Sequence, residues 1–211
     1  MIGDSADGYV GLRAALIGEL LAVPPDLAIG STVRDTISLE DLVAADALSI
    51  HESPPTVGLS DGDTPMLSAK DIRVGRAASR RGTAGVPGTV VVRAGDVAVV
   101  MGGEGAVHVC SETDVLLGPG IQLVRGNANS VDPQFLAGVL RAAVESGPTD
   151  LYRVSIPRVP LAEQRRIGMA FRQLHELEVT WRHRRTMIEE LVRSGVRGLA
   201  AGELRPADVE E

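Results

Sequence analysis

Hydrophobic residues follow helical spacing near both ends of the chain and form short runs between them. Near the start, "GYVGLRAALIGELLAV" predicts an amphipathic helix over residues 8–23, which Pro24 and Pro25 end. Its apolar positions are Val10, Leu12, Leu16, Ile17, Leu20 and Leu21. In "SLEDLVAADALSI", Ser38 is a suitable N-cap and Asp41 follows three residues later, which predicts a second short helix. The first helix is short and amphipathic, so it needs a packing partner.

The middle of the chain has the pattern of a β-rich domain. From Met66, the pieces "PMLSAKDIRV", "GTVVVRAGDVAVVM", "GAVHVC", "GIQLVRG" and "YRVSIP" are short and are separated by Gly and Pro. They predict several short, mostly antiparallel strands. One helix interrupts them in "VDPQFLAGVLRAAVESG", where Asp132 is the cap and Pro133 takes the first helical position. The side of this helix that we expect to be buried carries Phe135, Leu136, Val139, Leu140 and Val144.

The last part of the chain predicts one long helix. In "SIPRVPLAEQRRIG", Pro157 and Pro160 exclude helix before Leu161 and allow it afterwards, and no proline occurs from there to about Val196. The apolar positions repeat every seven residues, which is typical of a coiled-coil seam. One register contains Ile167, Leu174, Trp181 and Ile188, and the other contains Ala170, Leu177, Arg184 and Leu191.

We predict that this seam contacts another helix along its length. The predicted interface residues are Ile167, Leu174, Leu177, Trp181, Ile188 and Leu191. The alternative is that the helix packs on its own domain, because Arg184 interrupts the seam and Gly168 and Gly195 weaken it. The fold class predicted from these patterns is α+β, with a β-rich domain and short helices followed by a long C-terminal helix of coiled-coil type.

The charge distribution identifies one stretch suited to a polyanion. The net charge of −7 is uneven, since residues 1–64 carry −9, residues 65–160 carry +2 and residues 161–211 carry 0. Within the middle segment, six basic residues stand against Asp71 alone, a local charge of +5. They are candidate contacts to nucleic-acid phosphates, and a solvated basic face is the alternative. The six residues are Lys70, Arg73, Arg76, Arg80, Arg81 and Arg93.

The composition excludes several other classes of protein. The single cysteine, Cys110, excludes an internal disulfide and a cysteine-based zinc cluster, which agrees with a reducing cytoplasm. No apolar run approaches the ~20 residues that span a bilayer, and the start of the sequence lacks the pattern of a signal peptide. We therefore expect a cytoplasmic protein without a membrane partner.

We expect no catalytic residue, metal site or cofactor. "MGGEGAVHVC" lacks the Lys-Ser/Thr ending of a phosphate-binding loop and predicts a hairpin turn. His108 and Cys110 share one face of a strand, but a buried cysteine beside an ordinary histidine is the simpler interpretation. His175 and His183 lie about two helical turns apart, too far for one metal ion. The sequence also lacks the Asn-Pro-Pro-Tyr and Asp-Pro-Pro-Tyr motifs of amino-methyltransferases.

The order of these segments resembles a known family. A β-rich segment, a strand that ends in "IPRVPLAEQRRIG" and a long helix resemble the target recognition domain and following helix of type I restriction-modification specificity subunits. Two other segments are similar to parts of this family: "DTPMLSAKDI" with its Asp71-Ile72 pair, and "VVRAGDVAVVMGGEG" with Gly95 and Asp96. "VDPQFLAGVLRA" stands where the family has its small helix. The residues that carry the main motif are Ile156, Pro157, Pro160, Leu161, Glu163, Gln164, Arg165 and Ile167.

The resemblance implies a non-enzymatic reader of double-stranded DNA sequence that serves an N6-adenine DNA methyltransferase subunit or domain. It covers about residues 38–204, enough for one recognition domain and one long helix, where a complete subunit has two of each. The chain is therefore expected to be a half-size subunit that forms a homodimer through its helix, or the recognition end of a longer methyltransferase. The acidic leading helix slightly favours the second arrangement.

The predicted organisation has four parts. Residues 1–30 form an N-terminal helical segment, residues 31–160 the DNA-binding target recognition domain, residues 161–204 the spacer or dimerisation helix, and residues 205–211 a tail. The alternative function is an oligomerisation or adaptor module that acts through its C-terminal helix and binds no DNA. Salt-sensitive duplex binding distinguishes the two.

Overall fold

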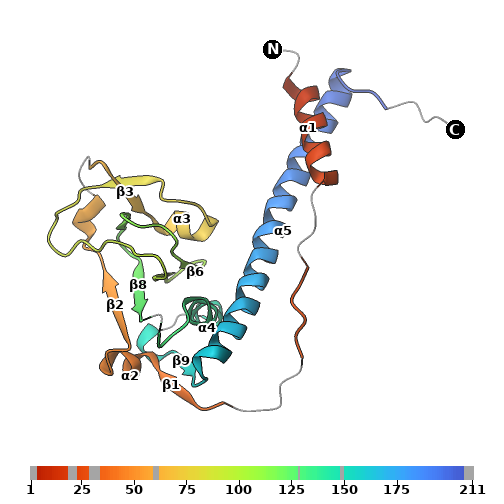
Figure 1. Cartoon of the computed structure of the whole chain (residues 1–211). Helices are drawn as coiled ribbons and strands as arrows, with labels where there is room; N and C mark the ends of the chain where they lie inside the picture. Colours follow the sequence, from red (N-terminus) through yellow and green to blue (C-terminus); the bar gives the residue numbers. More distant parts are fainter. Residues whose placement is uncertain are drawn as a thin grey trace. The chain divides into compact units, whose positions relative to one another are not determined.

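The chain divides into two units in the computed structural model, which describes residues 4–18, 23–28, 34–58, 62–127, 129–147 and 150–206 (Figure 1). Leu27–Arg172 forms one unit, which contains all the strands and is called the β-rich unit below. Met1–Asp26 and Gln173–Glu211 form the other, called the helical unit. The α+β class and the long C-terminal helix are confirmed.

The β-rich unit contains three small sheets. The four-stranded sheet is antiparallel and has the order β2 (Leu48–Glu52), β8 (Gln122–Gly126), β5 (Val97–Val100) and β6 (Ala106–Val109). The three-stranded sheet has the order β4 (Arg80–Gly82), β3 (Thr64–Leu67) and β7 (Leu116–Leu117), with a parallel pair between β3 and β7. The third sheet is the antiparallel pair of β1 (Thr36–Ser38) and β9 (Ser155–Pro157).

Five α-helices and two 3₁₀ turns accompany these sheets in the described part of the chain. They are α1 (Asp4–Gly18), α2 (Leu39–Ala44), η1 (Pro55–Gly58), α3 (Ala69–Val74), α4 (Pro133–Glu145), η2 (Leu151–Arg153) and α5 (Leu161–Ala201). Two predicted caps are confirmed: the Ser38 hydroxyl accepts the Asp41 N–H, and the Asp132 carboxylate accepts the Phe135 N–H. No described helix combines the length and apolar character needed to cross a membrane.

Three predicted elements differ in the structure. The first helix begins at Asp4 instead of residue 8; residues 19–22 lie outside the described ones, and Val23 is not helical. The helix predicted after Ser38 ends at Ala44, because Asp46 takes a left-handed conformation (φ 55°) and the chain then enters β2. The predicted strand piece that starts near Met66 contains α3, so two helices interrupt the strands.

Helix α3 forms because a capping box starts it. The Ser68 side chain accepts the Asp71 N–H, and the Asp71 carboxylate accepts the Ser68 N–H. Gly75 ends the helix in the left-handed conformation (φ 64°). These local signals outweigh the strand propensity of Ile72 and Val74.

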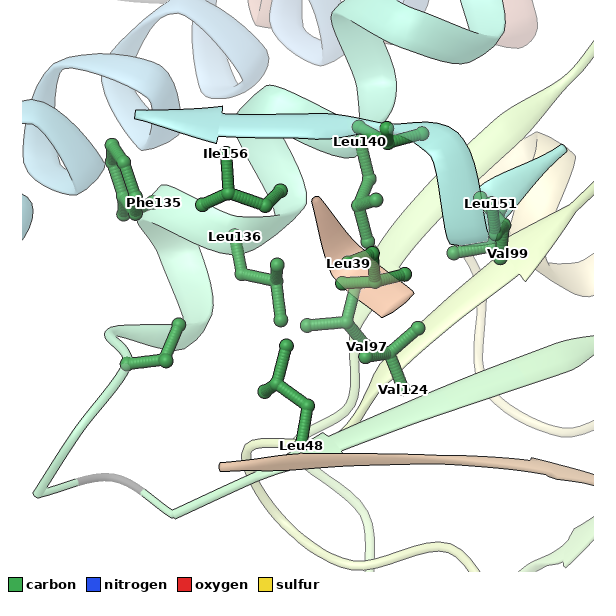
Figure 2. Packing of buried hydrophobic residues seen from close by; sticks show 12 residues of the cluster. Leu39, Leu48, Val97, Val99, Val124, Phe135, Leu136, Leu140, Leu151 and Ile156 are labelled. Carbon is green, nitrogen blue, oxygen red and sulfur yellow. The ribbon is translucent and has the colours of Figure 1, made fainter. Parts of the chain in front are cut away.

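The main core lies between the four-stranded sheet and the helices that cover it. In Figure 2, Leu39 of α2, Val97 and Val99 of β5, and Leu136 and Leu140 of α4 point toward one another. The other buried members are Leu48, Val124, Val131, Phe135, Leu151, Val154 and Ile156. A second buried cluster on the other side of β5 and β8 includes Ala98, Val100 and Leu123. Alternation of side chains along these strands therefore supplies two cores.

Gln164 explains why a Glu-Gln pair follows the prolines. Its side chain is 8% exposed, accepts the Asp132 N–H at 3.0 Å and donates to the Val159 carbonyl at 3.0 Å. It thus joins the start of α4 to the turn that precedes α5. Neighbouring Glu163 forms a surface ion pair with Arg34 at 2.6 Å, which contributes less because both side chains are exposed.

Two glycines allow α4 and α5 to approach closely. A Cβ on Gly168 of α5 would collide with the Asp132 carboxylate and lie 2.8 Å from the Phe135 nitrogen. A Cβ on Gly138 of α4 would collide with the ring of Phe171. Gly168 is therefore a contact point, rather than only a weak point of the helix.

The helical unit gives α1 its partner. Tyr9 of α1 packs against Gly195 of α5, where an added Cβ would lie 3.1 Å from the tyrosine ring. Leu16 is buried on the same side of α1, whereas Val10 and Ile17 are exposed. The buried side of α1 is therefore narrower than predicted, and it includes Tyr9.

We predict that Gln164→Ala lowers the free energy of unfolding by about 2–4 kcal/mol, because it leaves the Asp132 N–H and the Val159 carbonyl without their partner. The measurement is the midpoint of urea unfolding. Gln173→Ala, at an exposed position of the same helix, is the matched control and should change stability by less than about 0.5 kcal/mol. Equal effects of the two substitutions would contradict the role of Gln164.

We predict opposite effects for two Gly→Ala substitutions in helices. Gly168→Ala should destabilise the β-rich unit by about 1–3 kcal/mol, because the new methyl group has no room against α4. Gly11→Ala in α1 should be neutral or stabilise by up to about 1 kcal/mol, since a Cβ there meets nothing within 4 Å. Thermal unfolding of both variants tests this, and stabilisation by Gly168→Ala would contradict the close approach.

Candidate nucleic-acid interface

The six predicted phosphate contacts lie on three neighbouring segments of the β-rich unit. Lys70 and Arg73 are on α3, and Arg76 is in the turn after it. Arg80 and Arg81 are on β4, which pairs with β3 immediately before α3. Arg93 follows a short extended segment at residues 90–92. The structure thus gathers five of the six around β3 and α3.

Hydrogen bonds place residues 90–92, which directly precede Arg93, at the other edge of the same sheet. Leu116 of β7 pairs with Met66 of β3 on one side and bridges to Val91 on the other. The Val92 N–H donates to the Val115 carbonyl at 2.8 Å, which extends this pairing. The order of neighbouring segments across the sheet is therefore β4, β3, β7 and residues 90–92. At ~4.8 Å between neighbouring strands, the main chains of the two edges, beside Arg80 and Arg93, lie roughly 14 Å apart.

Three of these side chains have free charged ends. The side chains of Lys70, Arg80 and Arg93 are exposed, and their charged ends form no hydrogen bond or ion pair with any residue that the structure describes. Arg81 is also exposed and donates to the Asp63 carbonyl at 2.5 Å. Together these four side chains present positive charge to solvent, Lys70 from α3 and the three arginines from the edges of the sheet.

Arg76 is held by a buried carboxylate. Asp71 is 0% exposed and accepts hydrogen bonds from the Arg76 guanidinium at 2.6 Å and from the Ser79 hydroxyl at 2.6 Å, besides those from Ser68. Burial by itself would raise the pKa of Asp71, but the hydrogen bonds from Ser68, Ser79 and Arg76 outweigh it and hold the pKa well below its usual value. Asp71 therefore fixes the turn between α3 and β4.

Arg73 is also bound internally. Its guanidinium donates from Nε to the Glu104 carbonyl at 2.8 Å and from Nη2 to the Gly102 carbonyl at 3.2 Å. Both acceptors are main-chain atoms of the β5–β6 turn. Arg73 thus links α3 to this turn.

A second buried carboxylate organises the segment that carries Arg93. Asp96 is 3% exposed and accepts two hydrogen bonds from the Arg125 guanidinium, at 2.9 and 2.7 Å, and one from the Arg93 N–H. Arg125 also donates to the Val91 carbonyl, and its bond to Asp96 raises its pKa. We did not predict Arg125. The sequence signal that could have indicated a buried cation is Asp96, an acidic residue between Gly95 and a strand, because a buried carboxylate needs a positively charged partner.

The predicted helix seam has two different environments. Ile167 lies in the β-rich unit and packs against its main core. In the helical unit, Leu174 is 40% exposed, Trp181 64% and Ile188 43%, while Leu177 and Leu191 are partly buried. A groove of about 480 Å³ lies along this face and is lined by Leu174, Leu177, Glu178, Trp181, Arg182 and Arg185. The apolar surface between residues 174 and 188 is thus uncovered in the single chain.

Burial changes the pKa of both Cys110 and His108. Cys110 is buried, and burial together with the charges of Asp96 and Glu112 raises its pKa to about 12, so the thiol stays protonated at neutral pH. Burial lowers the pKa of His108. Over the described ranges, no group of three His, Cys, Asp or Glu side chains is arranged to hold a metal ion.

Comparison with known proteins identifies the fold. No protein-family model matches the sequence, and no curated protein matches it either. The HsdS subunit from Thermoanaerobacter tengcongensis has a similar structure, with 22% identity, a TM-score of 0.54, and coverage of 90% of this chain and 49% of that chain. A chain from a structure that describes the complex assembly of the type I restriction-modification system is also similar. It has 21% identity, a TM-score of 0.52, and coverage of 93% of this chain and 50% of that chain. The chain spans about half the length of these proteins, and over that length it has the HsdS fold that the sequence motif predicted.

Proposed function

We propose that this chain recognises a double-stranded DNA sequence for a type I restriction-modification or related DNA methyltransferase system. The observation that carries the proposal is the set of free basic side chains on the two edges of one small sheet, within a fold shared with HsdS subunits. Phosphate contacts from both edges would position the domain, and side chains between them would read bases.

The width of the sheet between its two edges supports this geometry. The edges that carry Arg80 and Arg93 lie roughly 14 Å apart, which is comparable with the width of about 12 Å of the major groove of B-DNA. Lys70, Arg80, Arg81 and Arg93 are the proposed phosphate contacts. Arg76 is not among them, because its guanidinium is paired with the ionised carboxylate of Asp71 at 2.6 Å.

We propose that methylation and cleavage depend on other proteins or domains, so that this chain is a specificity module and not an enzyme. The uncovered face of α5 supports a partner contact, since Leu174, Trp181 and Ile188 expose apolar surface. Two partners fit the proposal: a second copy of the chain, which would give two recognition domains, or a methyltransferase subunit or domain.

The second candidate function is an adaptor that acts through α5 without binding DNA. The same exposed apolar face favours it, because a helix face of this kind needs a partner whether or not DNA is bound. The adaptor function requires no role for the basic residues at the edges of the sheet. The two functions therefore predict different effects of charge reversal at β4 on DNA binding.

We predict that the double substitution Arg80→Glu and Arg81→Glu weakens binding to a randomised duplex pool at least about tenfold. It should also lower the salt slope of log K by about 1.8, since each phosphate contact contributes about 0.9. The measurement is a titration at several salt concentrations. Arg153→Glu is the control for charge reversal at one site, because its side chain is 85% exposed in the same unit but outside residues 70–93. Unchanged binding by the double variant would favour the adaptor.

We predict that Leu174→Asp combined with Ile188→Asp abolishes association through α5, because it places two charges within the apolar face. The mass in solution and the binding of a methyltransferase subunit are the measurements. Arg193→Asp introduces the same carboxylate at an exposed position on the opposite face of the heptad repeat and should leave both unchanged. If the double variant kept the mass and the partner of the wild type, the proposed interface would be wrong.

A further inference from the structure

The β5–β6 turn is held from both sides although it projects into solvent. On one side, Arg73 of α3 donates to the carbonyls of Gly102 and Glu104. On the other side, Gly105 meets α4 so closely that an added Cβ would collide with Val144. The tip between these anchors is open, because a Cβ on Gly102 or Gly103 would meet nothing within 4 Å. An exposed turn with two anchors is preorganised for contact with another molecule.

Glu104 at this tip carries a free carboxylate in a basic neighbourhood. It is exposed, and its side chain forms no hydrogen bond or ion pair with the residues that the structure describes. The guanidinium of Arg73 binds the main-chain carbonyl of Glu104 instead of the carboxylate. The acid is therefore available beside α3, which also carries Lys70.

We infer that the β5–β6 turn reads a base through Glu104 and that Arg73 acts as a positioning residue for this turn instead of contacting phosphate. This inference rests on the proposed function. A carboxylate is repelled by phosphates but accepts hydrogen bonds from base amino groups, and Glu pairs in this way with the N4 amino group of cytosine in the major groove. The chemical group recognised is thus a base amino group, with cytosine favoured.

The role of Arg73 depends on the shape of its side chain. The planar guanidinium donates in two directions and spans two carbonyls of the turn, whereas a lysine ammonium is a single point of charge. Arg73→Lys therefore keeps the charge and loses the geometry. A phosphate contact would behave in the opposite way, because lysine satisfies a phosphate.

The experiment uses the full chain. The wild type is first used to select a motif from a randomised duplex pool, and the enriched duplex and a scrambled duplex are then titrated over a salt series. We expect Arg73→Ala and Arg73→Lys each to reduce the preference for the enriched duplex about tenfold without changing the salt slope. Lys70→Ala, one helical turn earlier, should lower the salt slope by about 0.9 and keep the preference.

Glu104→Gln tests the turn without disturbing its anchors, because the side chain is exposed and unpaired. We expect the selected motif to change at one base position. An unchanged motif would overturn the role of Glu104, even if the Arg73 variants failed to fold. A salt slope lowered by Arg73→Ala and restored by Arg73→Lys would make Arg73 a phosphate contact and overturn its positioning role. Failure of the wild type to retain any duplex would overturn the proposed function itself, and this inference with it.

Discussion

The contact between α4 and the first turns of α5 is the constraint on which the β-rich unit depends. Gly138 and Gly168 remove the side chains that would separate the two helices. Gln164 then joins the N-terminus of α4 to the turn before α5 through two hydrogen bonds of 3.0 Å. Because Phe135 and Leu136 extend from the same end of α4 into the main core, the contact with residues 161–172 of α5 and the packing of the sheet depend on each other within the β-rich unit.

Two buried carboxylates organise the loops around this core. Asp71 holds the turn after α3, and Asp96 holds the segment before β5 through Arg125. A buried carboxylate is stable only when cations and N–H or O–H donors surround it. These aspartates therefore direct nearby main chain and arginines inward, and they leave Lys70, Arg80 and Arg93 to carry the exposed charge.

The arginines between residues 70 and 93 consequently have two kinds of role. Arg73 and Arg76 are bound to acceptors within the chain, whereas Arg80 and Arg93 extend from the sheet edges without such acceptors among the described residues. A count of basic residues in the sequence does not distinguish these two groups of arginines. Loops held rigid by Arg73 and Arg76 would present Arg80 and Arg93 in a fixed arrangement. Sequence-specific recognition of a stiff duplex requires such an arrangement.

The sequence by itself determined the features that depend on neighbouring residues: the caps at Ser38 and Asp132, the start of α5 after Pro160, and the α+β class. Tertiary structure decided the rest. Ile167 and Leu174 occupy the same position of the heptad repeat, yet one packs on the core and the other is exposed. The repeat marks an apolar face, but which surface covers that face depends on segments far away in the chain. Likewise, the acceptors that bind Arg73 are about thirty residues distant, so only the folded chain shows that this arginine is already engaged.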